Sequence, residues 1–202
     1  MNINKAIFLF LLTISTTCFS QNKAKDDITD ITKATFFGPG ISYEKKIGKF
    51  QTLFGRAFIN TSFSIGYSSS LGNISSITFD PALSIQYRYY YNYYKRQKKG
   101  KMTEQNSLNY LSPTFETIFS KNRISTSDNI ENNRKAINTV GLVWGIQRNY
   151  KKRFSLDLNL GLGYLFTKTT SLDNSGQTIN VTFRQFTTLG RFNLGFWLNK
   201  RK

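Results

Sequence analysis

Apolar and polar residues alternate strictly in residues 154–166, which have the sequence FSLDLNLGLGYLF. Each even-numbered position carries a large apolar or aromatic side chain, whereas the odd positions in the middle carry Ser, Asp, Asn or Gly. Successive side chains of a β-strand point to opposite faces, so this pattern predicts a strand with one apolar and one polar face. The segment is roughly twice as long as the common strand of about five to six residues.

The same alternation returns elsewhere in the chain and predicts further strands. They are expected in residues 37–43, 53–67, 77–93, 111–119, 140–146 and 192–198. An eighth strand is expected within residues 26–35, where the alternation is weaker, and the last strand is expected to bend at Gly190. No segment has a helical period long enough for a packing helix, and no apolar run reaches the roughly 18 residues of a transmembrane helix. The chain is therefore expected to be all-β.

No predicted helix covers the apolar faces of these strands. A strand of about 13 residues spans roughly 43 Å, or roughly 33 Å of height at a tilt near 40°, which exceeds the apolar band of about 25 Å in an outer membrane. The expected fold is an antiparallel up-and-down transmembrane β-barrel of about eight strands with a polar interior. Aromatic residues near strand ends suit two interfacial girdles: Tyr87, Tyr89, Tyr91, Tyr93, Tyr94, Tyr150, Phe154, Tyr164 and Phe166. A soluble barrel of the lipocalin kind, with its apolar faces turned inward, is the alternative interpretation.

The first 20 residues, MNINKAIFLFLLTISTTCFS, have the organisation of a secretory signal peptide. Lys5 supplies a positive charge, a short apolar core follows, and small residues precede an expected cleavage site between Ser20 and Gln21. The alternative is a lipoprotein signal in which Cys18, the only cysteine, is lipidated. The expected domains are a cleaved signal peptide (1–20), an N-terminal segment or weak first strand (21–33) and the barrel (34–202).

Positive charge is concentrated in one set of links between the predicted strands. The chain has 28 Lys and Arg against 11 Asp and Glu, a net charge of +17. Every second link is short and basic and the C-terminus is basic too, so 15 of the 28 fall on one rim of the barrel. The basic rim comprises Lys45, Lys46, Lys49, Lys95, Arg96, Lys98, Lys99, Lys101, Lys151, Lys152 and Arg153. Arg148 and residues 200–202 complete the fifteen.

Short turns and the C-terminus of outer-membrane barrels lie in the periplasm, which would place the basic rim there. It is expected either to contact anionic lipid head groups or a periplasmic polymer, or simply to keep the rim solvated. Nucleic acid, another common partner of basic proteins, is not expected for an exported barrel. The opposite links, residues 68–75, 121–135 and 171–178, are longer and carry no recognisable motif.

Charged residues of both signs are expected on the inward, polar faces of the strands. They are Glu44, Arg56, Asp80, Arg88, Glu116, Asp157 and Arg191. The interior of an eight-stranded barrel is just wide enough for side chains to fill it, so buried charges must pair or form hydrogen bonds. The favoured interpretation is a salt-bridged plug that closes the barrel, and a narrow conduit or ligand site is the alternative.

Enzymatic chemistry is not expected. The chain has no histidine, and no cysteine would remain after signal cleavage, which removes the usual general base, the thiol nucleophile and a zinc site. Gly161 and Gly163 lie in mid-strand, where they cannot form a phosphate-binding loop. A carboxylate pair could still perform acid–base chemistry, but no motif indicates one. Neither a metal nor a cofactor is expected.

Four segments carry a resemblance to a known class of proteins: GPGISYEKKIGKFQTLFG, IQYRYYYNYYKRQKKGK, VWGIQRNYKKRFSLDLNLGLGY and RFNLGFWL. With them the chain resembles the small eight-stranded outer-membrane barrels of the OmpA/OmpX kind, and more narrowly the short outer-membrane β-barrel proteins common in Bacteroidetes. The resemblance implies a monomer in the outer membrane of a Gram-negative bacterium, surrounded by its lipids and inserted by the barrel-assembly machinery. It implies a structural or loop-mediated binding role in the envelope, with a narrow channel or a barrel that transports lipids or hydrophobic compounds as the alternative. Such barrels often end on an aromatic residue, whereas here four polar residues follow Leu198.

Overall fold

The computed structural model describes residues 28–68, 72–120, 134–172 and 177–199. The predicted signal peptide, including Cys18, lies outside the described residues. The strands are β1 (Ile31–Phe37), β2 (Gly40–Gly48), β3 (Gln51–Ser68), β4 (Gly72–Tyr89), β5 (Asn109–Ser120), β6 (Lys135–Asn149), β7 (Phe154–Leu172) and β8 (Thr178–Trp197). The helix α2 (Tyr93–Lys98) and a single 3-10 turn, η1 (Glu104–Asn106), lie between β4 and β5. In the described ranges, no helix is long and apolar enough to cross a membrane.

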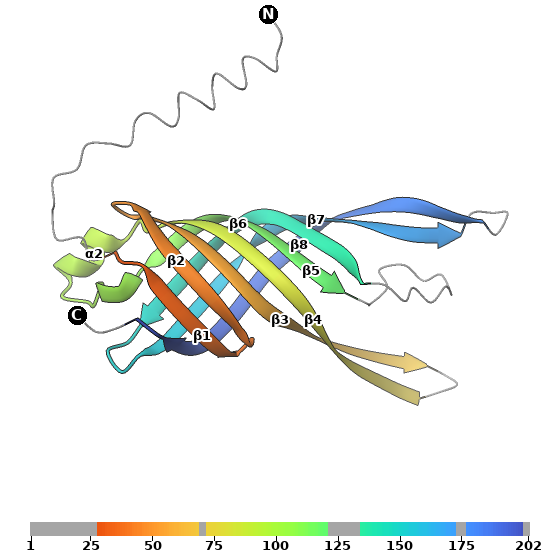
Figure 1. Cartoon of the computed structure of the whole chain (residues 1–202), viewed down its shortest axis with the longest axis horizontal. Helices are drawn as coiled ribbons and strands as arrows, with labels where there is room; N and C mark the ends of the chain where they lie inside the picture. The colour runs from red at the N-terminus through yellow and green to blue at the C-terminus, as the bar shows by residue number, and fades with distance from the viewer. Residues whose placement is uncertain (1–27, 69–71, 121–133, 173–176, 200–202) are drawn as a thin grey trace, which may run out of the picture.

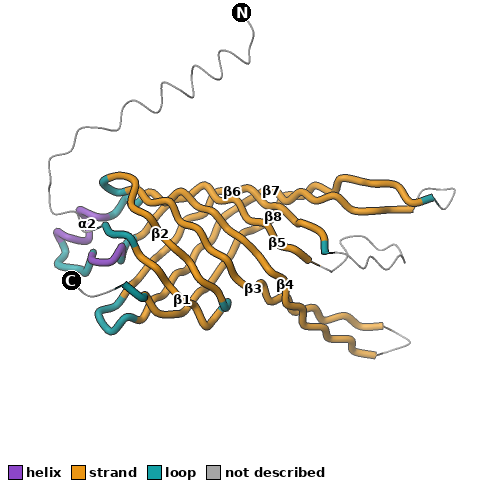
Figure 2. The backbone as a smooth tube through the Cα atoms, in the orientation of Figure 1, coloured by secondary structure: helices purple, strands orange, loops and turns teal. Residues whose placement is uncertain are grey.

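The strands form one closed antiparallel ring in sequence order, with β1 paired to β8 (Figures 1 and 2). The predicted eight-stranded antiparallel barrel is therefore confirmed. If paired residues are followed from strand to strand around the ring, starting at Ala34 of β1, the path reaches Arg184 of β8. Ala34 itself pairs with Phe196 of β8, so the ring closes with a stagger of 12 residues (184 to 196). Stagger and strand tilt are linked in a barrel, and the strands accordingly cross Figure 1 obliquely.

The prediction of one strand over residues 37–43 is wrong, because a tight turn divides this segment into β1 and β2. Gly38 adopts φ 64°, a conformation that glycine reaches without steric cost, and Pro39 cannot donate a ladder hydrogen bond. The hydroxyl of Thr35 donates to the Gly38 carbonyl at 2.7 Å and holds the turn. The expected bend at Gly190 does not break β8, which pairs continuously with β7 on both sides of this residue.

The wall of the ring has an uneven height. β3 and β4 pair as far as Ser68 and Gly72, but β2 reaches only Phe58 of β3 and β5 reaches only Ala82 of β4. β7 and β8 likewise pair out to Leu172, beyond both of their other neighbours. Two hairpins therefore project from the ring at the end opposite α2 (Figure 1).

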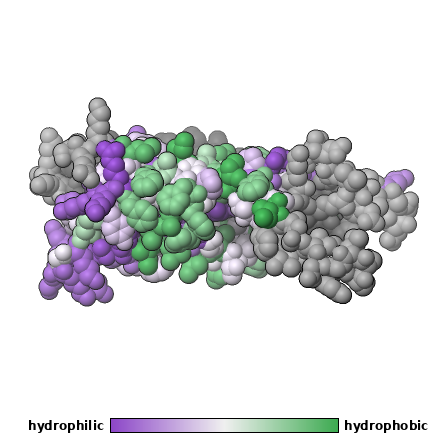
Figure 3. Space-filling view, turned by 90° about the horizontal axis from the view of Figure 1, so that it is seen from below, coloured by the Kyte–Doolittle hydropathy of each residue, from purple (hydrophilic) through white to green (hydrophobic). Residues whose placement is uncertain are grey.

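The outer face of the ring is apolar and the inner face is polar. Leu162, Leu142 and Phe79 on the outer face have exposed fractions of 70 %, 68 % and 62 %, whereas Glu44 and Gln147 on the inner face are fully buried. Figure 3 shows the resulting apolar band beside a hydrophilic end. Soluble proteins bury their large apolar side chains and rarely expose extended apolar patches. The apolar faces are therefore turned outward, and the alternative arrangement with apolar faces inside the barrel is wrong.

The link after β4 is more than the short basic turn predicted for it. The chain forms α2 and η1 and then returns to the ring through Leu108, which is fully buried. Leu108 packs in a small apolar cluster with Ile28, Tyr93 and Tyr110. Asn106, at φ 58°, exchanges two hydrogen bonds of 2.9 Å with the backbone of Thr29, which joins this link to the segment before β1. The link thus closes the ring at the end that carries the basic residues.

Candidate functional site

Three inward charges lie close to the end of the ring that carries α2, and we call them the ionic plug: Glu44, Arg88 and Asp157. Arg88 lies at its centre, with Nη1 2.9 Å from Oδ2 of Asp157 and 3.8 Å from Oε2 of Glu44. Its Nε donates to Gln86 at 2.9 Å, and Nη1 also donates to Gln147. Its guanidinium lies against an aromatic ring 3.6 Å away, that of Phe54, which shields the ion pairs from water. The result is a buried arginine that is paired and hydrogen-bonded, as a buried charge requires.

Glu44 is held by donors from several strands. Its Oε1 accepts hydrogen bonds from Thr52 at 2.8 Å and from Asn106 at 2.9 Å, and also from the hydroxyl of Tyr90. Its Oε2 accepts one from Gln147 at 3.1 Å and lies 3.8 Å from the ammonium group of Lys33. Every one of these partners is buried. The carboxylate therefore ties β1, β2, β3 and β6 to the link after β4.

The third member of the plug, Asp157, depends on a close approach between β5 and β6. Tyr110 donates from its hydroxyl to Oδ1 of Asp157 at 2.8 Å, and its ring lies 4.3 Å from the guanidinium carbon of Arg88. The ring passes directly over Gly145, where an added Cβ would lie 2.2 Å from a ring carbon. Gly145 is therefore needed for its lack of a side chain, because any Cβ there would displace the tyrosine.

The remaining inward charges lie nearer the end with the projecting hairpins, where Arg56 and Asp80 are buried but Glu116 and Arg191 are partly exposed. Arg191 pairs with Glu116 at 2.6 Å, and their side chains are 23 % and 15 % exposed. Arg56 donates from Nη2 to the Gly38 carbonyl, but its buried Nε and Nη1 have no hydrogen-bond partner among the described residues. The guanidinium groups of Arg56 and Arg191 both lie over the ring of Phe58, at 4.4 and 4.2 Å.

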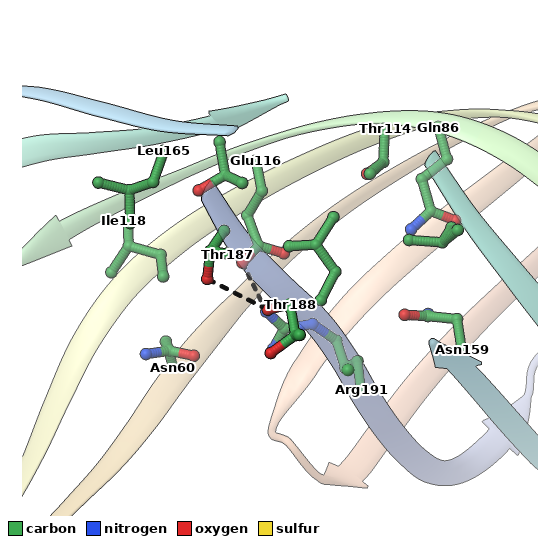
Figure 4. A pocket seen from close by; sticks show the side chains of 14 residues that line it. Asn60, Gln86, Thr114, Glu116, Ile118, Asn159, Leu165, Thr187, Thr188 and Arg191 are labelled. Carbon is green, nitrogen blue, oxygen red and sulfur yellow. Dashed lines mark hydrogen bonds and ion pairs between the residues drawn. The ribbon is translucent and has the colours of Figure 1, made fainter. Parts of the chain in front are cut away.

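A cavity of about 220 Å³ lies in this half of the interior (Figure 4). Most of its wall comes from inward side chains of β3 to β8, among them Asn60, Thr114 and the pair of Glu116 and Arg191. Gln86 also lines it and accepts a hydrogen bond from Arg88, so the wall of the cavity is in direct contact with the ionic plug.

All seven predicted interior charges lie on the inner face, but they do not form a single network. Three of them make up the ionic plug, and Glu116 pairs with Arg191. Asp80 instead meets Arg134, at 2.7 Å, and the hydroxyl of Ser120, at 2.7 Å, near the projecting end. Arg56 forms no ion pair among the described residues. The uncharged partners of the plug, together with Lys33, were not predicted.

The predicted basic rim lies at the end of the ring that carries α2. Most of its side chains are exposed, while Lys46 and Arg96 are half-buried. Lys45 and Lys46 belong to β2 itself, and only the turn that includes Lys49 follows it. The basic residues at 200–202 lie outside the described part of the chain.

In the described ranges, no three His, Cys, Asp or Glu residues are grouped as a metal site would need. The carboxylates of the plug are engaged by cations and hydrogen-bond donors, so neither is free to act as a base. What the arrangement can do is close the ring.

Known proteins give no match to this chain. No family model, no curated protein and no solved structure matches it. The resemblance to small outer-membrane barrels therefore rests on the sequence segments alone.

Proposed function

We propose that the chain is an integral β-barrel of the Gram-negative outer membrane, closed inside by the ionic plug, with a structural or binding role in the cell envelope. The observation that carries this proposal is the reversed distribution of side chains, apolar outside and charged inside. A hydrocarbon environment favours such a surface, which would be costly in water. In a closed ring, each strand forms backbone hydrogen bonds with a neighbour on both sides. A β-structure that crosses a lipid bilayer requires this, because lipid offers no hydrogen-bond partners.

The plug supports a closed rather than a conducting barrel. Arg88 and Glu44 are 1 % and 0 % exposed, and their side chains bridge the interior from β4 and β2. Ions that crossed this layer would have to separate charges that are buried and paired. The binding role then falls to the projecting hairpins β3–β4 and β7–β8, at the end opposite the plug.

Transport is the second candidate, and the cavity above the plug favours it. The cavity offers room for a small ligand, and Asn60 and Arg191 in its wall carry hydrogen-bond donors. On this view the plug would act as a barrier that moves, rather than as a fixed seal.

The proposed placement also assigns the partners. Outer-membrane lipids surround the apolar band, the assembly machinery inserts the exported chain, and the basic rim lies in the periplasm. The barrel functions as a monomer without a cofactor, and it has no enzymatic activity.

Extraction of the native protein from membranes tests the placement. An integral barrel remains in the membrane during carbonate and high-salt washes and is released by detergent. Recovery of soluble protein after either wash would refute the proposal. In planar bilayers the purified protein is expected to show no unitary current, whereas discrete openings altered by Arg56→Ala or Arg88→Ala would favour transport.

Proteolysis of intact cells tests the orientation. With the basic rim in the periplasm, external trypsin should cut only within residues 121–135, at Lys121, Arg123, Arg134 or Lys135, because residues 68–75 and 171–178 contain no Lys or Arg. Lys98 and Lys99 should stay protected until the outer membrane is opened. Cleavage at either lysine in unbroken cells would reverse the orientation without affecting the placement in the membrane.

A further inference from the structure

A second cavity, of about 310 Å³, lies at the basic rim, where β5 and β6 meet α2. Five cationic side chains line it: Lys95, Arg96, Lys99, Lys101 and Arg148. None of the residues that line it is acidic, and in the described part of the chain no ion pair joins any of the five to a carboxylate. The cavity therefore concentrates positive charge that no carboxylate of the described residues neutralises.

The two arginines are fixed in place by the backbone. Arg96 donates from Nε and Nη2 to the Met102 carbonyl, at 3.3 and 3.0 Å. Arg148 donates from Nη1 to the Gln147 carbonyl at 2.6 Å and from Nη2 to Oδ1 of Asn109 at 2.7 Å. The bonds of Arg148 use two of the five N–H groups that a guanidinium carries. The remaining groups are pre-oriented donors, which suit the oxygen atoms of a phosphate.

The electrostatics of the cavity also favour an anion. Partial burial lowers the pKa of the Arg96 guanidinium from its ordinary value, which means that the surroundings disfavour its charge. An anion bound between the five cations would relieve this penalty. The lysines add charge on flexible stems, so they can follow the position of a ligand.

The cavity continues directly into the apolar outer face of the barrel. Trp144 and Ile146 precede Arg148 on the outer face of β6, and Leu111 of β5 pairs with Trp144. At about 3.3 Å per residue, Arg148 lies roughly 13 Å along the strand from Trp144. Trp144 donates a hydrogen bond of 2.6 Å to the hydroxyl of Tyr91, which itself lines the cavity. Figure 3 shows the hydrophilic end bordering the apolar band.

We propose that this cavity binds the phosphate of an anionic phospholipid, whose acyl chain lies along the outer face of β5 and β6. The proposal rests on the placement of the barrel in a membrane. A soluble phosphate compound would use the cations but not the apolar surface that leads out of the cavity. A phospholipid carries both features in one molecule. Its phosphate would lie among the cations of the cavity, and its acyl chain would lie along the adjoining apolar surface.

Fluorescence quenching by brominated lipids tests the proposal in the full chain. Of the two tryptophans, Trp144 is 38 % exposed on the outer face, whereas Trp197 is 2 % exposed inside the ring. Quenching by brominated acyl chains therefore reports on lipid beside the cavity. The protein is reconstituted in phosphatidylcholine with brominated phosphatidylglycerol, and in parallel with brominated phosphatidylcholine. Phosphatidylglycerol should quench at a several-fold lower mole fraction.

Two matched double variants separate the cavity from the general charge of the rim. Lys95→Gln with Lys99→Gln removes two cations that line the cavity and that carry no described side-chain hydrogen bond. Lys98→Gln with Lys152→Gln removes two exposed cations from the same rim outside the cavity. The first variant should lower the preference for phosphatidylglycerol by at least about fivefold, which is the contribution expected of a single basic residue beside an anionic head group. The second should lower it by less than about 1.5-fold, because neither lysine lines the cavity and salt screens charges at a distance from the bound head group.

The outcomes distinguish this inference from the proposed function. Equal quenching by both brominated lipids, or equal losses in the two variants, would overturn the lipid site and leave the membrane barrel intact. No quenching by either lipid would mean that Trp144 does not face the bilayer, and would overturn both. Abolition of the preference by soluble glycerol phosphate would show that the acyl chain contributes nothing, and would overturn the assignment to a phospholipid.

Discussion

The two halves of the barrel interior both contain pairs of arginine and glutamate, but the pairs differ in how far they are buried. Near the basic rim, Arg88 and Glu44 are almost completely buried, and the link after β4 covers them. Near the projecting hairpins, Arg191 and Glu116 are also paired but remain partly exposed beside a cavity. β1 and β2 contribute no described residue to that cavity, because their turn at Gly38 and Pro39 ends the wall early. Whether an ion pair forms part of a closed plug or lies beside an open cavity is therefore determined by how completely the neighbouring strands enclose it, and not by the charges themselves.

Removal of the central arginine of the plug should have the largest effect. Arg88→Met leaves Asp157 buried without its cation and Glu44 with Lys33 alone, which is expected to lower the free energy of unfolding by about 3–5 kcal/mol. Arg191→Met removes a partly exposed partner and should lower it by less than about 1 kcal/mol. Urea titration of the refolded protein in lipid vesicles measures both. Similar losses in the two variants would show that the halves are equally enclosed.

The stability cost of arginine substitutions along the outer face of β7 should show how deep each half of the barrel lies in the bilayer. Leu160→Arg should disfavour the folded barrel by about 2–4 kcal/mol if this position lies near the midplane. Leu156→Arg, closer to the basic rim, should cost less, since the penalty falls towards the interface. Asn159→Ser is the inward control, and its loss should not exceed the roughly 1 kcal/mol of a hydrogen bond. Equal sensitivity at Leu160 and Asn159, by the same titration, would contradict the assignment of faces.

An added methyl group at Gly145 should disturb only the plug. Gly145→Ala places a Cβ within 2.2 Å of the Tyr110 ring and should lower the free energy of unfolding by about 1–3 kcal/mol, as overpacking does. Gly55→Ala is the control, because an added Cβ there meets nothing within 4 Å and the change should stay within about 0.5 kcal/mol. If Gly145→Ala were as mild as the control, the contact between Tyr110 and Asp157 would not be needed for the plug.

Cysteine labelling should reveal the boundary between the halves without a loss of stability. Thr114 and Ser112 lie two residues apart on the inner face of β5, but only Thr114 lines the cavity, while Ser112 is 1 % exposed. Thr114→Cys should react with a small methanethiosulfonate reagent in the folded protein. Ser112→Cys should remain unmodified until the protein is unfolded by urea. Rapid labelling at both positions, followed by mass spectrometry, would show that water crosses the plug.

The strands and their faces were predictable because alternation is a local signal. The period of two along residues 154–166 assigns each of them to one face, and the assignment holds in the ring. The turn between β1 and β2 was missed because Phe37, Pro39 and Ile41 continue the apolar alternation across it. The glycine at position 38 was the available signal, since it reaches a positive φ and precedes a proline.

The interior charges were predictable, but their partners were not. Alternation places Arg88 and Asp157 on the inner face without specifying the register that brings them together across the ring. The link after β4 was read as a basic turn because its lysines dominate the composition. Asn106 and Tyr90 give no local sign that they will donate to Glu44, because that contact depends on how the whole link packs against the ring.

The pairing of β1 with β8 has a consequence for the order of folding. Seven of the eight strand contacts join neighbours in sequence and can form as local hairpins. The eighth joins Lys33 to Trp197 through only four residue pairs, at opposite ends of the chain. Asn199 adds two hydrogen bonds to it, accepting from Thr32 and donating to the Asp30 carbonyl at 2.8 and 2.9 Å. The entropy of closing a loop rises with its length, so we expect this seam to form last, with residues 194–199 joining β1 after the other strands have paired.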